Sequence, residues 1–133
     1  MKILFCAGVA PIVDDGDASL RFYRDLLGLP LEGDEYVAAH GLDGLKHFGL
    51  WPLSDAARSC FGAGAWPDHV ARPQACIEFE VDDVDAAVEE LRGRGCDVLS
   101  GPVTEPWGQE VARLLSPEGL LIGVTWTPWV HEG

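Results

Sequence analysis

The chain has 133 residues, of which 22 are acidic and 9 basic, giving a formal net charge of −13 at pH 7. Because nucleic-acid phosphates are bound through basic surfaces, this charge argues against a nucleic-acid partner. No apolar run reaches membrane length, so we expect no membrane partner, and the length suits one domain over residues 1–133. Four cysteines outside any CxxC pair are expected to be reduced thiols of a cytoplasmic protein.

The first part of the chain, residues 1–53, is typical of a strand followed by a helix and more strands. The apolar run 3–13 predicts a strand, and the acidic turn after it contains Asp15 and Asp17, which favour a helix start. Apolar residues at helical spacing then run to Gly28 and predict one buried helix face. These residues are Leu20, Tyr23, Leu26 and Leu27. Further short apolar runs predict strands at 30–33, 35–40 and 45–52.

The second part, residues 75–133, repeats this order after a linker at 54–74. Small residues, Gly and Pro in the linker favour a helical turn followed by an extended arm. A strand is predicted at 75–81 and a helix from Asp83 to Gly95. Strands are then predicted at 97–100, 109–115 and 120–126.

The two parts are similar in sequence as well as in order. VDDGDASLRFYRDLLGLPL from Val13 returns 68 positions later as VDDVDAAVEELRGRGCDVL from Val81, with identity at seven of nineteen positions. A repeat of this kind indicates a duplicated supersecondary unit. We therefore predict two copies of one module related by a pseudo-twofold axis, with both helices packed on a sheet.

The repeated segments carry a family resemblance. FYRDLLGLPL, EFEVDDVDAAVEELRGRG, GPVTEPWG and LLSPEGLLIGV are similar to segments of the vicinal oxygen chelate superfamily of glyoxalases, bleomycin-resistance proteins and extradiol dioxygenases. The resemblance implies an α+β fold. In this fold, two pseudo-symmetric βαβββ modules form an open, cup-like curled sheet with helices outside, commonly in a homodimer. A ligand or a metal ion lies at the bottom of the cup.

The resemblance also assigns four positions to metal ligands, and this sequence departs from the pattern there. Metal-dependent members offer His, Gln or Glu at the positions that here hold Gly8, Gly49, Cys76 and Gly123. Three glycines and one thiol do not form such a site. We therefore expect no metal, no cofactor and no catalytic residue.

The expected function is metal-independent binding of an aromatic or cationic natural product or antibiotic, as in the bleomycin-resistance branch. An alternative is a metal-dependent lyase or dioxygenase-like oxygenase with displaced ligands. The candidates for those ligands are His40, His47, Glu78 and Glu110. A third hypothesis is a scaffold with a vestigial cup.

Alternation along strands predicts which side chains line the cup. Leu4, Cys6 and Ala10 should share a face with Gly8, and a ligand should stack between two of the five tryptophans, Trp51 and Trp107. The predicted ligand-binding residues are His47, Trp51, Trp66, Cys76, Glu78, Trp107 and Arg113. A core or interface role fits the tryptophans too, and Arg113 could either pair with Glu78 or bind an anionic ligand group.

Overall fold

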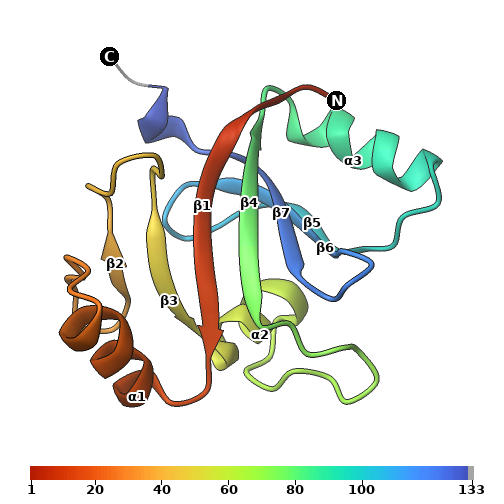
Figure 1. Ribbon diagram of the computed structural model, residues 1–133. Helices are drawn as coiled ribbons and strands as arrows, with labels where there is room; N and C mark the ends of the chain where they lie inside the picture. The colour runs from red at the N-terminus through yellow and green to blue at the C-terminus, as the bar shows by residue number, and fades with distance from the viewer. Residues whose placement is uncertain (132–133) are drawn as a thin grey trace.

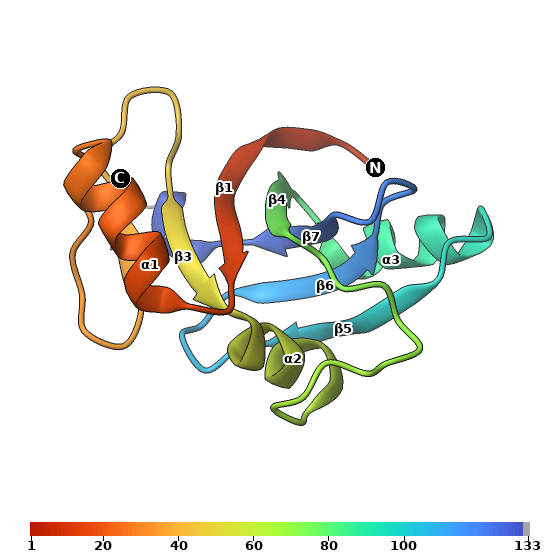
Figure 2. The same ribbon diagram turned by 60° about the horizontal axis from the view of Figure 1, so that its bottom comes forward.

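The computed structural model describes residues 1–131 as one seven-stranded mixed sheet with three helices longer than one turn (Figure 1). The strand order is β2-β3-β1-β4-β7-β6-β5. The strands are β1 (Ile3–Val13), β2 (Val37–Ala39), β3 (Phe48–Pro52), β4 (Ala75–Val81), β5 (Val98–Thr104), β6 (Glu110–Leu115) and β7 (Leu121–Trp126). The two expected parts join where β1 pairs antiparallel with β4. The α+β fold class and the curled open sheet expected from the sequence are confirmed (Figure 2).

Two helical segments pack on the outer face of the sheet, and both begin at the predicted caps. Asp15 accepts a hydrogen bond from the backbone N–H of Ala18 and starts α1 (Gly16–Leu20), which continues as the π-helix η1 (Arg21–Leu26). Asp83 caps α3 (Val84–Gly93) in the same way. These carboxylates satisfy backbone donors that a helix start leaves free.

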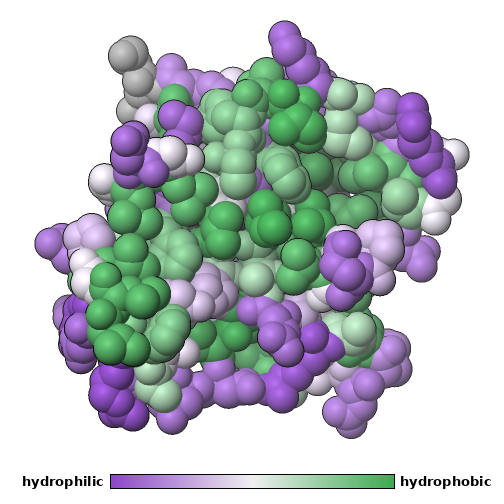
Figure 3. Space-filling view, viewed as in Figure 1, coloured by the Kyte–Doolittle hydropathy of each residue, from purple (hydrophilic) through white to green (hydrophobic). Residues whose placement is uncertain are grey.

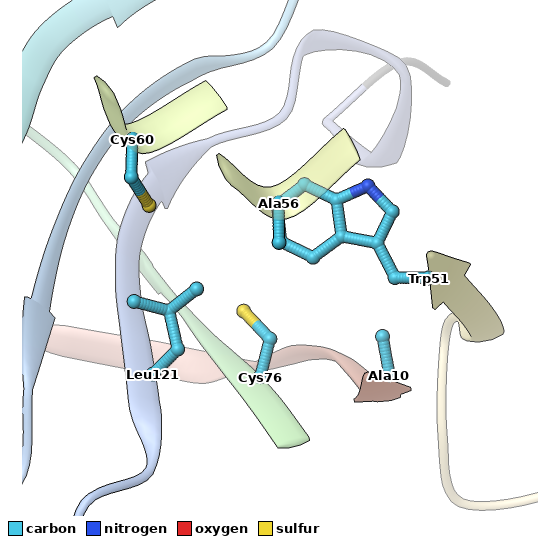
Figure 4. Packing of buried hydrophobic residues seen from close by; sticks show 6 residues of the cluster. All are labelled: Ala10, Trp51, Ala56, Cys60, Cys76 and Leu121. Atoms are coloured by element: carbon cyan, nitrogen blue, oxygen red, sulfur yellow. The ribbon is translucent and has the colours of Figure 1, made fainter. Parts of the chain in front are cut away.

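A third helix, α2 (Leu53–Phe61), lies where the sequence predicted only a helical turn. It packs on the concave side of the sheet, whereas α1 and α3 lie outside (Figure 2). Its small side chains Ala56 and Cys60 are buried against the strands (Figure 4). The strand residues of this cluster are Ala10, Trp51, Cys76 and Leu121. The helix therefore covers one end of the concave face.

Three expectations about local structure were wrong. The predicted strand 30–33 contributes only an isolated bridge between Glu32 and Ala38. Leu26 and Leu27 are exposed, because only the first turns of the helix reach the sheet. Register shifts in β1 between Ile3 and Phe5, and again between Cys6 and Gly8, reverse the alternation.

The shifts in β1 change which residues face inward. Phe5 pairs with Glu80 and Gly8 with Glu78, so these positions share the concave face, and Cys6 pairs with Phe79 on the outer face. Leu4 falls within the first shift. Of the residues expected beside Gly8, Ala10 alone keeps its predicted place, in the cluster with Cys76.

The outer face of β1 and β4 lies uncovered between α1 and α3. Apolar side chains gather over this face (Figure 3). No helix within residues 1–131 is long and apolar enough to cross a membrane. All four cysteines are free thiols.

Candidate functional site

The four positions of the family's metal ligands come together on the concave face. Gly8 of β1 and Gly123 of β7 each pair with Glu78, which lies between them on β4. Cys76 is two residues earlier on β4, and Gly49 lies on β3, next to β1. These four positions therefore lie together on the concave face. We use the term concave floor for them and for the side chains around them, which are Tyr36, His40, His47, Ser59, Glu78, Gln109 and Arg113.

In the β3 half of the floor, neighbouring side chains fill the space that the glycines leave. A Cβ at Gly49 would overlap the Tyr36 hydroxyl and would lie 3.1 Å from Nε2 of His47. A Cβ at Gly8 would touch the His47 ring at 3.4 Å. A glutamate at position 49 would therefore displace Tyr36, so the glycine is required by close packing.

Tyr36, His47 and His40 form a hydrogen-bonded chain. The Tyr36 hydroxyl lies 2.5 Å from His47 Nε2, and His47 Nδ1 lies 2.9 Å from His40 Nε2. Partial burial, followed by the negative charge of Glu78, raises the pKa of Tyr36 and keeps its proton on. Burial, followed by the neighbouring His40, lowers the pKa of His47.

These pKa shifts decide which atom donates and which accepts in each of the two hydrogen bonds. A neutral His47 accepts from Tyr36 at Nε2, so its Nδ1 carries the proton and donates to Nε2 of His40. The chain of hydrogen bonds runs from Tyr36, which is 40% exposed, to the exposed His40.

Arg113 organises the β7 half of the floor and is 1% exposed. Its Nη2 lies 3.1 Å from Oε2 of Glu78, and its Nε donates to Ser59 Oγ of α2 at 3.1 Å. The guanidinium also lies over the Trp51 ring, 4.6 Å from the centroid. Of the two roles considered for Arg113 from the sequence, the structure shows the pairing with Glu78.

The electrostatics of this half favour a fixed cation and an inert thiol. Burial is the largest single influence and lowers the pKa of Arg113, but Glu78 together with Cys76, Cys60 and Glu105 outweighs it, so the net shift is upward. Burial raises the pKa of Cys76 to about 12, although Arg113 Nη1 lies 3.3 Å from its Sγ. A thiol with this pKa stays protonated at neutral pH and is a poor nucleophile.

Gln109 links the floor to an exposed tryptophan. Its Nε2 donates to Glu78 Oε1 at 3.2 Å, and its Oε1 accepts from Trp107 Nε1 at 3.1 Å. The Trp107 indole is thereby held in one orientation while 51% of the residue stays exposed. The Trp107 ring is therefore an exposed aromatic surface that Gln109 connects to the concave floor.

The side chains present do not fit a divalent ion. Within residues 1–131, no group of three or more His, Cys, Asp or Glu side chains is arranged to hold one. The nitrogens of His47 are used by Tyr36 and His40, and Glu78 is paired with Arg113. Glu110, a candidate displaced ligand, faces away: it pairs with Trp126 in the sheet and lies near Asp83 and Asp85 of the α3 side.

The structure brings some predicted residues together and separates others. Trp51, Cys76 and Glu78 all surround Arg113. Trp51 is 9% exposed and packs under α2, so the expectation of an open stacking wall there is corrected: the indole belongs to the core. Trp66 packs edge-on against Phe61 and donates to the Val70 carbonyl in the linker, and its part in ligand binding stays a prediction.

Three further residues of the floor were not predicted as ligand-binding residues. Tyr36 precedes β2, and its direction depends on pairing with β3, which no local pattern reveals. Gln109 was assigned to a strand without a role. Ser59 of α2 was missed because the linker was not expected to cover the concave side.

A separate hollow of about 490 Å³ lies at the end of β1. Asp14, Tyr23 and Arg72 are among its lining residues, and Arg72 pairs with Asp14. It shares no residue with the concave floor.

Comparison with known proteins defines the class. The family model of the glyoxalase/bleomycin resistance protein/dioxygenase superfamily matches residues 8–124, so the chain belongs to this superfamily and the resemblance expected from its sequence is confirmed. It is 30% identical over 119 residues to the uncharacterized protein YaeR of Escherichia coli K12, covering 84% of this chain and 88% of the relative.

Two solved structures are similar in fold at lower identity. A superfamily member from Vibrio splendidus 12B01 has a TM-score of 0.60 at 17% identity and covers 88% of this chain and 94% of its own. A variant of Streptomyces coelicolor methylmalonyl-CoA epimerase in complex with 2-nitronate-propionyl-CoA has a TM-score of 0.55 at 19% identity, covering 93% and 97%. At these identities the likeness shows the fold alone.

Proposed function

We propose that the chain binds a planar, positively charged small molecule on its concave face without using a metal ion. The proposal rests on the residues at the four positions where metal-dependent members of the family have metal ligands. Three are glycines and the fourth is a protonated thiol, and side chains that are already hydrogen-bonded fill the space beside them. The floor is therefore a preformed surface with fixed polar groups, which suits ligand binding.

Charge and aromatic surface support the choice of ligand. Glu78 and Glu105 are the carboxylates nearest to the charge of Arg113: Glu78 pairs with it, and Glu105, directly after β5, raises its pKa. Trp107 offers an exposed ring whose face attracts cations. The net charge of −13 adds long-range attraction for cations.

Titration with proflavine, a planar aromatic cation, tests the proposal. We expect saturable binding that quenches tryptophan emission and that Trp107→Ala weakens by about tenfold, in line with a lost cation–π contact of roughly 1–2 kcal/mol. Trp129→Ala is the matched control, because Trp129 is 48% exposed but lies on η2 (Pro128–Val130). Equal loss in both variants, or binding of an anionic naphthalene sulfonate as tight as that of proflavine, would contradict the proposal.

A second candidate function is metal-free proton transfer, and the Tyr36–His47–His40 chain is the observation that favours it. A neutral imidazole next to a protonated phenol is a general acid–base pair. Methylmalonyl-CoA incubated with the protein in D2O is a direct test, since epimerisation exchanges the proton next to the carbonyl. Deuterium incorporation that His47→Gln abolishes would favour this candidate, and no incorporation would remove it.

The homodimer expected from the sequence stays a prediction. Sedimentation equilibrium at several concentrations would test it.

A further inference from the structure

Glu80 is a buried carboxylate on the concave face at the end of β4, and it is 0% exposed. Its Oε1 accepts hydrogen bonds from the hydroxyls of Thr125 and Thr127, each at 2.9 Å. Its Oε2 accepts from the backbone N–H of Thr127 at 2.6 Å and lies 2.6 Å from Nε2 of His131. Both oxygens are therefore held in fixed positions by β7 and the segment that follows it.

Hydrogen-bond donors and a cationic partner both stabilise a buried carboxylate, because desolvation of an unpaired charge costs several kcal/mol. His131 is the basic group that meets Glu80 within residues 1–131. Its ring stacks on Trp126 with centroids 3.7 Å apart and planes inclined by 7°. Phe5 lies on β1 at 6.0 Å from the same ring.

These contacts describe how a planar cation is recognised. A flat ring lies on an indole face and donates an N–H in its own plane to a carboxylate that other groups have already oriented. The surrounding groups come from β1, β4, β7 and Thr127, which directly follows β7, whereas the ring itself comes from the residue after η2. The binding groups thus belong to the sheet and to Thr127. The ring that they bind belongs to the segment 128–131, which we call the tail.

The tail is held weakly compared with the binding groups. The His131 side chain is 23% exposed, and η2 is a single 3-10 turn closed by the bonds Val130 N–H to Thr127 O and His131 N–H to Pro128 O. No residue of η2 is buried. Segments with few buried contacts open at low free energy.

We infer that Glu80, Thr127 and Trp126 form a binding site for a planar cation, such as an imidazolium or an amidinium, and that His131 is its built-in competitor. This site does not include Trp107, although Gln109 bonds both Trp107 and Thr127, and the inference stands whether or not proflavine binds beside Trp107. An external cation gains access when the tail swings away, and the tethered ring competes at an effective concentration on the order of millimolar.

Chemical rescue with free imidazole tests the inference. In His131→Ala the ring is removed and its site is left open. We expect imidazole to raise the melting temperature of this variant saturably and to change its tryptophan emission. The apparent Kd should be about tenfold or more below that of the wild-type protein, whose own ring competes. The variant His131→Ala with Glu80→Gln keeps the shape but removes the charge and should lose the effect.

Two controls separate the site from general effects of the ligand. His131→Phe fills the space over Trp126 without an N–H donor, so imidazole should leave it unchanged. Saturation-transfer NMR on His131→Ala should show contact between imidazole and the protein that Glu80→Gln abolishes. Equal imidazole responses in wild-type protein, His131→Ala and the double variant would overturn the inference, and so would no response in any of them.

Discussion

Removing the buried cation of the floor should destabilise the protein far more than removing an exposed one. In Arg113→Met, Glu78 loses its ion pair at 3.1 Å, and the bond to Ser59 and the stacking on Trp51 disappear. Breaking a buried pair by removing one partner costs about 3–5 kcal/mol. Because the Glu78 side chain is 18% exposed and partly hydrated, we expect the lower end, about 3 kcal/mol.

The free energy of unfolding in urea, which leaves charges unscreened, is the suitable measurement. Arg113→Met combined with Glu78→Gln removes both charges and should recover about 2 kcal/mol of the loss. The control is Arg58→Met, which breaks an exposed pair with Asp55 and should cost less than about 0.5 kcal/mol. A loss below about 1 kcal/mol for Arg113→Met, or a double variant no more stable than the single one, would refute this reasoning.

Three further predictions concern the floor. Iodoacetamide at mildly alkaline pH should label the exposed Cys96 and leave Cys76 unmodified, because burial raises the pKa of Cys76 from 9.0 to about 12. Mass spectrometry would identify the labelled cysteines, and early labelling of Cys76 would contradict this prediction. Gly49→Ala should destabilise the protein by about 1–3 kcal/mol in urea because its Cβ overlaps the hydroxyl and the Cζ atom of Tyr36. The same substitution should cost much less in a Tyr36→Ala background, which lacks the ring. An unchanged midpoint for Gly49→Ala would show that the floor is loosely packed. Because the pKa of His47 is lowered in the folded protein, the unfolded chain binds a proton more readily, so the free energy of unfolding should fall as the pH drops below 6.5. Urea titrations at stepped pH values should show a flatter pH dependence for His47→Gln than for the wild-type protein. An identical pH dependence in both proteins would contradict this prediction.

Much of the fold follows from local signals in the sequence. The caps Asp15 and Asp83 act through bonds to residues three positions away, so a local pattern predicts them. The alternation in β4 places Cys76, Glu78 and Glu80 on one face, as expected, because β4 pairs with β7 without interruption. The four family positions then come together because β3, β1, β4 and β7 are neighbours in the sheet.

The remaining features depend on contacts that are distant in sequence. The shifts in β1 arise from its pairing with residues of β4 that lie 70 to 78 positions further along the chain, so counting alternate residues failed at Cys6. Burial of Trp51 follows from α2 covering the concave side. The pairing of Arg113 with Glu78 was one of two interpretations, and only the register of β4, β7 and β6 decides between them.

The central claim is that a ligand binds the concave face without a metal ion. The most direct test is a proflavine titration of protein treated with a chelator, compared with protein supplied with manganese, nickel, iron or zinc, with bound metal per chain measured by elemental analysis. The account predicts the same affinity in every sample and no stoichiometric metal. Stoichiometric metal together with binding that appears only in a metal-supplied sample would contradict it.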